Sequence, residues 1–123
     1  MGIIESLFWL SLNIYHEARG EEYMGKLAVA HVTLNSSKQK NKSIKQIVQE
    51  PFQFSWTIEN EYLPDPKDVL LFIECMGVGI HAANGFDFTM GATHYHATRI
   101  DPYWTSSMSD VGQYGNHIFY VKK

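Results

Sequence analysis

Glu17 is the residue whose position most clearly suggests chemistry. Apolar residues at Ile3, Leu7, Leu10 and Ile14 are spaced four, three and four apart, which predicts one face of a helix. The next step of three reaches Glu17, so its carboxyl group is expected on the buried side, in the last helical turn. Burial and the helix dipole both raise a carboxyl pKa, and a protonated carboxylic acid can act as the general acid in glycoside cleavage. A structural ion pair is the alternative.

A second carboxylate is usual in glycoside hydrolysis, but the sequence does not single one out. The candidates are Glu21, Glu59, Asp87 and Asp101. Each of them is also compatible with a solvated surface position. Glu21 follows Glu17 by four residues, although Gly20 is expected to end the helix between them. A mechanism that uses a single carboxyl group therefore has to be considered.

Histidines suggest a different chemistry. His94 and His96 share one face of a predicted strand, and His117 on the next strand could join them. Three imidazoles can hold a catalytic zinc ion with an open fourth position, which would make the protein a metal-dependent amidase or peptidase. The alternative is that these side chains form hydrogen bonds to a substrate or to one another. No His-Glu-x-x-His motif or cysteine pair supports a metal, so we expect no cofactor.

Aromatic residues make up 14% of the chain, which is more than a core of this size requires. Residues 52–56 and 102–104 mix rings with polar side chains. Sugars present apolar C–H faces and hydroxyl edges, so these two segments are candidates for a carbohydrate-binding surface. Packing of the same rings into the core is the alternative.

The composition excludes several classes of protein. The chain has 123 residues, 45% of them hydrophobic, which predicts one globular domain over 1–123. Its net charge of −3 argues against a nucleic-acid partner, and no apolar run approaches the roughly 20 residues that span a bilayer. The single cysteine, Cys75, cannot form an internal disulfide, and the N-terminus shows no secretory signal pattern.

The elements that must position these residues are helices followed by strands. Periodicity predicts helices over 3–19, with Gly20 as the C-cap, over 22–35 and over 66–84, with a polar loop over 36–43. Ser43 and Gln46 form a capping-box pattern that predicts a short helix from Ile44. Alternation predicts strands over 93–97 and 117–121, separated by a turn-rich loop. The expected fold class is α+β, mainly helical with a small antiparallel sheet near the C-terminus.

The helix over 66–84 carries two further patterns. Its apolar face is expected at Val69, Phe72, Ile73, Met76, Ile80 and Ala83. Residues 77–82 match the spacing of a dinucleotide-binding loop, but Asp65-Pro66 is typical of a helix start and no βαβ unit follows. Small residues that allow close helix packing are the preferred interpretation.

Six segments, taken in order, carry a family resemblance. They are residues 15–21 (Tyr-His-Glu-Ala-Arg-Gly-Glu), 25–35 (ending Val-Thr-Leu-Asn), 53–56 (Gln-Phe-Ser-Trp), 91–97 (Gly-Ala-Thr-His-Tyr-His-Ala), 102–104 (Pro-Tyr-Trp) and 115–120 (Gly-Asn-His-Ile-Phe-Tyr). Together they resemble the catalytic domain of the SleB/CwlJ-type cell wall hydrolases, the family of spore cortex-lytic enzymes and phage endolysins. Any one segment would be a weak signal, but six in the family's order cover nearly the whole chain.

The resemblance implies a lysozyme-like, lytic-transglycosylase-like fold and an enzyme that cleaves peptidoglycan. Glu17 matches the family's catalytic glutamate, and Arg19 is expected to hold the loop around it. By motif position and side-chain type, the residues expected to bind substrate are Gln53, Ser55, Trp56, Thr93, His94, Tyr95, His96, Trp104 and His117. The expected reaction breaks the bond between N-acetylmuramic acid and N-acetylglucosamine and leaves a 1,6-anhydro end. A hydrolytic muramidase is the first alternative, with Glu21 or Asp87 holding the water.

The biological setting is inferred from the same resemblance. A catalytic domain without a visible signal peptide or separate wall-binding domain is more similar to a phage endolysin than to a spore enzyme. We expect a monomer made in the host cytoplasm that reaches the cell wall after release by a holin. Its partner would be the glycan strands of bacterial peptidoglycan, without nucleic acid or membrane insertion.

Overall fold

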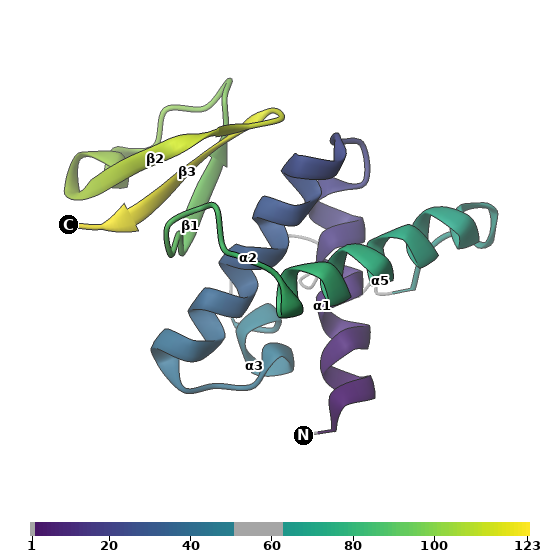
Figure 1. The fold of residues 1–123 in the computed structure, drawn as a ribbon. Helices are drawn as coiled ribbons and strands as arrows, with labels where there is room; N and C mark the ends of the chain where they lie inside the picture. Colours follow the sequence, from purple (N-terminus) through teal and green to yellow (C-terminus); the bar gives the residue numbers. More distant parts are fainter. Residues whose placement is uncertain (1, 51–62) are drawn as a thin grey trace.

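Four α-helices and a three-stranded sheet make up the computed structural model, which describes residues 2–50 and 63–123 (Figure 1). The helices are α1 (Ile3–Ala18), α2 (Tyr23–Lys40), α3 (Ile44–Val48) and α5 (Val69–Asn84). The strands are β1 (His94–Ala97), β2 (Met108–Tyr114) and β3 (His117–Lys122), and the short 3-10 helices are η1 (Pro66–Asp68) and η2 (Tyr103–Ser107). This confirms the α+β class. None of the described helices is long and apolar enough to cross a membrane.

The end of α1 lies one residue before the predicted position, which had Gly20 as the cap. The helix ends at Ala18, and Arg19 follows as its C-terminal cap residue. Leu10 and Ile14 are buried on the predicted face, whereas Ile3 at the start of this face is exposed. Glu17 therefore comes one turn after the core residue Ile14 and two turns after Leu10, in the last turn of the helix, as the spacing indicated.

α2 is the central helix, and it is longer than predicted. Ala28, Val29 and Ala30 in its middle are completely buried. The prediction of a loop over 36–43 was wrong for its first half, because the helix continues to Lys40. Serine, lysine and glutamine are compatible with helix, so a polar run does not by itself end one. The helix ends where Asn41 takes a left-handed backbone with a φ of 52°, which Asn tolerates better than most residues.

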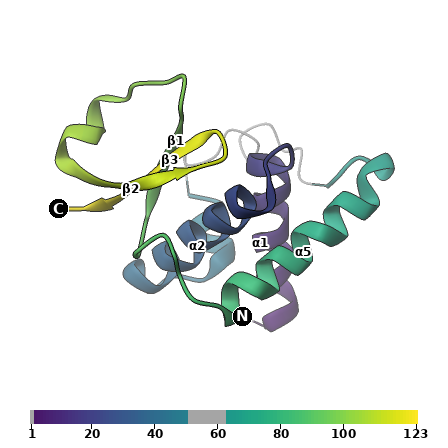
Figure 2. The ribbon, with the colours of Figure 1, turned by 45° about the horizontal axis from the view of Figure 1, so that its top comes forward.

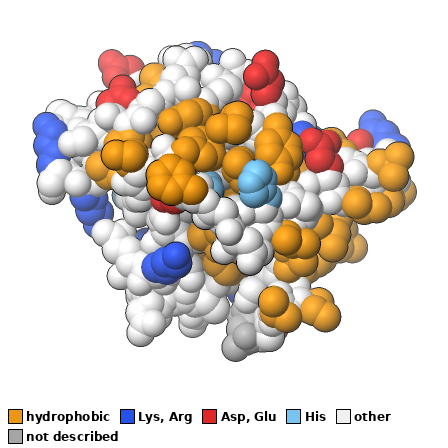
Figure 3. All heavy atoms as spheres, viewed as in Figure 1, with side chains coloured by type: hydrophobic (Ala, Val, Ile, Leu, Met, Phe, Trp, Pro, Cys, Tyr) orange, Lys and Arg blue, Asp and Glu red, His pale blue; other side chains and the backbone are white. Residues whose placement is uncertain are grey.

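α5 ends at the predicted residue, and the predicted first turn over 66–68 is the 3-10 helix η1, but α5 buries a different face. Cys75, Val78, Gly79 and Ala82 are its buried residues. The face expected from the sequence was wrong, because Val69, Ile73 and Ile80 are all more than half exposed. Hydrophobic side chains accordingly gather on the surface over α5 in Figure 3. The face of small residues is buried because it lets α1 approach closely: a Cβ on Gly79 would lie 3.1 Å from Leu10 Cδ2.

The two glycines of α5 should therefore respond differently to substitution. A Cβ on Gly77 would have no neighbour within 4 Å, so Gly77→Ala is expected to raise the free energy of unfolding by about 0.5–1 kcal/mol through the unfolded state. Gly79→Ala is the matched control, and its contact with Leu10 should cancel or reverse that gain. Denaturant titration measures both. Equal stabilisation by the two variants would contradict the packing derived for Gly79.

The sheet contains one strand that the sequence did not reveal. The strand order is β1-β3-β2, and both pairs are antiparallel. The prediction of a loop was wrong for β2, because its sequence is mostly polar and its register shifts between Asp110 and Gly112. Such a bulge breaks the alternation that marks a strand. Gly115 has a φ of 61° in the tight turn from β2 to β3, where a side chain would be strained.

The register of β1 on β3 gives the sheet two different faces. Tyr95 pairs with Phe119, which is completely buried among α2 residues such as Ala28 and Val29. Because side chains alternate along a strand, His94 and His96 lie on the opposite face. Figure 2 shows the sheet lying across α2, so the Tyr95 face is the inner face and the histidine face is the outer one.

Candidate active site

Glu17 at the end of α1 meets Tyr95 of β1. The Tyr95 hydroxyl donates a hydrogen bond to Glu17 Oε1 at 2.8 Å. Burial raises the pKa of the Glu17 carboxyl above its ordinary value of 4.5, and the bond from Tyr95 opposes part of this rise. The net direction is upward, which is the direction that a general acid needs at neutral pH. The sequence had predicted this from the position of Glu17 alone.

The raised pKa of Glu17 has a consequence for stability. The pKa of this carboxyl group is higher in the folded state than in the unfolded state. The free energy of unfolding therefore decreases as the pH rises from the pKa of the unfolded state to that of the folded state. We therefore expect Glu17→Gln to melt at a higher temperature than wild type at pH 7, with the difference shrinking as the pH falls below 4.5. Thermal melts over this range measure the effect. A variant less stable than wild type at pH 7 would contradict it.

The Tyr95 side chain is held in place by aromatic neighbours. Its ring centroid lies 5.4 Å from that of Phe119 and 5.1 Å from that of His117, the latter in an edge-to-face arrangement. Burial and the neighbouring Glu17 carboxyl both raise the pKa of the Tyr95 hydroxyl well above its ordinary value. The hydroxyl consequently stays protonated and can keep donating to Glu17.

Glu21 is occupied by the turn between β2 and β3. Its Oε1 accepts a hydrogen bond from the Asn116 backbone N–H at 3.0 Å, and its Oε2 accepts one from Asn116 Nδ2 at 3.1 Å. His117 Nδ1 lies 2.8 Å from Oε1 as an ion-pair contact, without the alignment of a hydrogen bond. The carboxylate side chain is only 8% exposed. Glu21 therefore fastens the β-turn to the connection between α1 and α2.

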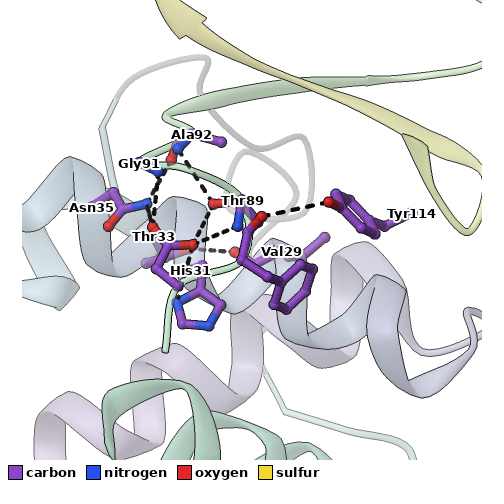
Figure 4. A network of polar contacts seen from close by, with 10 residues as sticks. Val29, His31, Thr33, Asn35, Thr89, Gly91, Ala92 and Tyr114 are labelled. Carbon is purple, nitrogen blue, oxygen red and sulfur yellow. Dashed lines mark hydrogen bonds and ion pairs between the residues drawn. The ribbon is translucent and has the colours of Figure 1, made fainter. Parts of the chain in front are cut away.

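Asp87 is likewise occupied by hydrogen-bond donors, among them Asn35, Thr89 and Gly91, which are labelled in the polar network of Figure 4. Its Oδ2 accepts hydrogen bonds from Asn35 Nδ2 at 2.8 Å and from the Gly91 N–H at 3.0 Å. Its Oδ1 accepts from the backbone N–H and the hydroxyl of Thr89 and lies 3.7 Å from His31 Nδ1. Burial raises the pKa of Asp87, but these hydrogen bonds outweigh burial and lower it overall. The carboxylate ties the approach to β1 onto α2.

Removing the Asp87 charge should destabilise the fold. Asp87→Asn would place an amide N–H₂ against groups that are themselves donors, so we expect a loss of about 2 kcal/mol in the free energy of unfolding. Because the folded pKa of Asp87 is lowered, wild type gains this stability above the ordinary value of 3.8 and loses it as the pH falls below that value. Denaturant titration at neutral and acid pH measures both effects.

The control for Asp87 is the exposed Asp101, for which Asp101→Asn should change the free energy of unfolding by less than about 0.5 kcal/mol. An unchanged free energy of unfolding for Asp87→Asn at pH 7 would show that the network of Figure 4 does not stabilise the fold.

Arg19 lies over the aromatic ring of Tyr15, with its guanidinium carbon 4.7 Å from the ring centroid. Tyr15 in turn donates a hydrogen bond from its hydroxyl to Asp68 Oδ2 at 2.7 Å. The contact places Arg19 on the residue two positions before Glu17, which is consistent with the expected role of holding this part of the chain. Among the described residues, Glu17 has no ion pair with Arg19.

The outer face of the sheet carries a separate aromatic cluster. His96 Nε2 lies 2.8 Å from the Tyr120 hydroxyl, and the two rings stack with centroids 5.3 Å apart. Trp104 of η2 approaches His94, His96 and Tyr120 at centroid distances of 5.5, 5.7 and 5.3 Å. Thr93 Oγ1 lies 2.9 Å from His94 Nδ1. Four residues expected to bind substrate, Thr93, His94, His96 and Trp104, thus meet here.

The idea of a three-histidine metal site was wrong. His117 pairs with Ala97 and lies on the inner face, while His94 and His96 lie on the outer face. Within residues 2–50 and 63–123, no group of three histidine, cysteine or acidic side chains could hold a metal ion. The residue spacing allowed such a site, but the strand register separates its members.

Some expectations lie outside the described residues, and some residues were missed. Gln53, Ser55, Trp56 and Glu59 belong to the segment 51–62, which the structure does not describe.

The sequence did not reveal two contacts of the site. Tyr95 was expected to bind substrate, but its hydroxyl contacts Glu17, and Asn116 was not expected as the partner of Glu21. The turn motif of residues 115–117 was the available signal for Asn116, but no local pattern shows its partner.

Several known proteins are similar to this chain in sequence. The family model described as Cell Wall Hydrolase matches residues 20–120. The chain is 30% identical to the spore cortex-lytic enzyme of Halalkalibacterium halodurans over 109 residues, which cover 86% of this chain and 32% of that protein. It is 29% identical to the spore cortex-lytic enzyme of Bacillus subtilis over 114 residues, covering 89% and 35%. The chain thus spans about a third of the length of these curated relatives.

Two solved structures share the fold. The catalytic domain of the Bacillus cereus SleB protein matches with a TM-score of 0.77 and 27% identity, over 98% of this chain and 93% of that one. The catalytic domain of the germination-specific lytic transglycosylase SleB from Bacillus anthracis matches with a TM-score of 0.78 and 24% identity, over 94% and 93%. The predicted lysozyme-like fold is confirmed by these matches.

Proposed function

The chain belongs to the Cell Wall Hydrolase family, and we propose that it cleaves peptidoglycan between N-acetylmuramic acid and N-acetylglucosamine as a lytic transglycosylase. The observation that carries this proposal is the half-buried Glu17, whose pKa is raised by burial and whose carboxyl group is oriented by the Tyr95 hydroxyl. SleB from Bacillus anthracis, whose catalytic domain has the same fold, is a lytic transglycosylase, and this supports the same reaction class here.

In the first step, the protonated Glu17 carboxyl donates its proton to the glycosidic oxygen. The bond between that oxygen and C1 of the muramic sugar breaks, and N-acetylglucosamine leaves with a free 4-hydroxyl. Positive charge develops at C1 and the ring oxygen. Glu17 is now a carboxylate, and the Tyr95 hydroxyl 2.8 Å away stabilises its new charge through the hydrogen bond.

In the second step, the Glu17 carboxylate removes the proton from the C6 hydroxyl of the same muramic sugar. The C6 oxygen bonds to C1 and closes the 1,6-anhydro ring, and Glu17 is again protonated. Because the nucleophile belongs to the substrate and is held near C1 by the ring, no second carboxylate is needed to position it. One residue thus acts first as acid and then as base.

The neighbouring acids favour this single-carboxyl mechanism over a hydrolytic one. A hydrolytic muramidase needs a polar group that holds the attacking water. The sequence offered Glu21 and Asp87 for this role, but the turn at Asn116 occupies both oxygens of Glu21, and the network of Figure 4 occupies both oxygens of Asp87. A hydrolytic muramidase is therefore the second candidate, because neither Glu21 nor Asp87 is free to hold the attacking water.

The experiment that separates the two reactions is digestion of purified peptidoglycan in heavy-oxygen water. A lytic transglycosylase gives anhydro-muramic ends without the heavy isotope, whereas a muramidase gives reducing ends that contain it. Mass spectrometry of the released fragments reads both. Release of free stem peptides with intact glycan strands would instead indicate an amidase and would overturn the proposal.

The setting in the cell is a separate part of the proposal. We propose that the chain acts as a monomeric endolysin that is made in the host cytoplasm and reaches the wall when a holin opens the membrane. Because its relatives include spore cortex-lytic enzymes, action on the spore cortex is the alternative setting. Expression in host cells with and without a holin tests the proposal, because an endolysin should lyse the cells only when the holin is present.

A further inference from the structure

A hollow lies on the outer face of the sheet, between η2 and the ends of the strands. It encloses about 480 Å³, and its walls include His94, Tyr103, Trp104, Ser107, Met108 and Lys122. Lys122 shares the outer face with Tyr120, because the two residues are two positions apart on β3. We call this feature the outer hollow. It is separated from Glu17 by the sheet, since Tyr95 points to the inner face and His94 to the outer one.

The aromatic walls of the outer hollow are suited to a sugar ring. Tyr103 is 92% exposed, so its ring has no role in the core and is free to contact a ligand. Trp104 beside it is held by a tilted ring contact with His94 and an edge contact with Tyr120, at centroid distances of 5.5 and 5.3 Å. A fixed ring next to an exposed one offers apolar surface to C–H groups, with polar atoms at the margin for hydroxyl and amide groups.

The charge of the outer hollow is positive, although the whole chain is negative. Among the described residues Lys122 forms no ion pair. Burial lowers the pKa of His94, and the positive charge of Lys122 lowers it further, which is consistent with both side chains lining the hollow. The carboxylates of Asp101 and Asp110 act on the neighbouring Tyr120, but neither aspartate lines the hollow. A cation beside aromatic rings fits a ligand that carries both a sugar and a carboxylate.

We propose that the outer hollow binds a second stretch of the peptidoglycan strand, with an acetylated sugar against Tyr103 and Trp104 and a peptide carboxylate at Lys122. This inference rests on the proposed function, because it names a further contact of the same substrate. Among the described strands, β1 lies at one edge of the sheet. Its Tyr95 contacts Glu17 on the inner face and its His94 lines the outer hollow, so we place the peptidoglycan strand across this edge. The hollow then contributes to the binding of long strands rather than to bond cleavage.

The test is binding to purified sacculi, measured by co-sedimentation in a Glu17→Gln background. Adding Tyr103→Ala or Lys122→Glu is expected to weaken binding about three- to tenfold each. The Lys122→Glu effect should diminish at high salt, because exposed charges are screened. The matched controls are Phe86→Ala, which removes another exposed ring, and Lys67→Glu, which reverses another exposed lysine. Both controls should bind like the parent, and thermal melts check that every variant folds.

Two further measurements separate the possible failures. In the first, the carboxyl groups of the sacculi are converted to amides. The parent and Lys122→Glu should then bind these sacculi equally, whereas Tyr103→Ala should still bind them more weakly than the parent. Unchanged binding in both outer-hollow variants, or equal losses in the controls, would overturn the inference. Release of free stem peptides by the wild-type chain would overturn the proposed function instead, and the binding ratios would still decide the role of the hollow.

Discussion

Glu17→Gln is expected to lower the rate of glycan cleavage by about 100- to 10,000-fold, the usual contribution of a general acid. Glutamine keeps the size of the side chain and can still accept the hydrogen bond from Tyr95, but it has no proton to donate to the glycosidic oxygen and cannot take one from the C6 hydroxyl. Both steps of the mechanism are therefore lost at once. Counting anhydro-muramic ends by mass spectrometry over time measures the effect.

The control for this experiment is Glu22→Gln. Glu22 precedes α2, is exposed, and makes no capping hydrogen bond with its side chain, so the variant should keep the wild-type rate. Anhydro ends released by Glu17→Gln at a rate within tenfold of wild type would mean that another group is the acid. The expected rise in melting temperature of Glu17→Gln shows separately that a loss of activity does not come from unfolding.

Much of the fold could be predicted because its signals are local. The capping box at Ser43 is present as expected, and Asp65 caps the helix that begins at Pro66. The strands β1 and β3 alternate strictly enough to be found from the sequence. β2 was missed because the bulge after Asp110 and its polar composition remove the alternation. The buried face of α5 was missed because the helix has two apolar faces, and only packing against α1 chooses between them.

The candidate site could be predicted only where its signal lies within one segment of the chain. The burial of Glu17 follows from the spacing of apolar residues within one helix, so one segment suffices to find it. Its contact with Tyr95 joins residues 78 positions apart, and the placement of His117 depends on the register of β1 against β3. Such relations require the tertiary structure. For this reason the sequence grouped three histidines that the sheet places on two faces.

The contact between Tyr95 and Glu17 assigns to Tyr95 a positioning role that can be measured. Tyr95→Phe keeps the ring that packs on Phe119 and His117 and removes only the hydroxyl. A hydrogen bond to a charged group contributes about 1.5–3 kcal/mol, so its loss in the step that forms the Glu17 carboxylate should lower kcat by about 10- to 100-fold. KM should change little, because the Tyr95 hydroxyl is bonded to Glu17 and the other residues expected to bind substrate are unchanged.

The pH dependence separates this role from a merely structural one. The Tyr95 hydrogen bond lowers the Glu17 pKa, so its removal should raise that pKa further. The protonated acid would then persist to higher pH, and the basic limb of the pH–rate profile should move upward. Tyr114→Phe is the matched control: it removes the hydroxyl that contacts the Phe88 carbonyl, so it should leave the limb in place. A basic limb that stays fixed or moves downward in Tyr95→Phe would show that the hydroxyl does not tune Glu17.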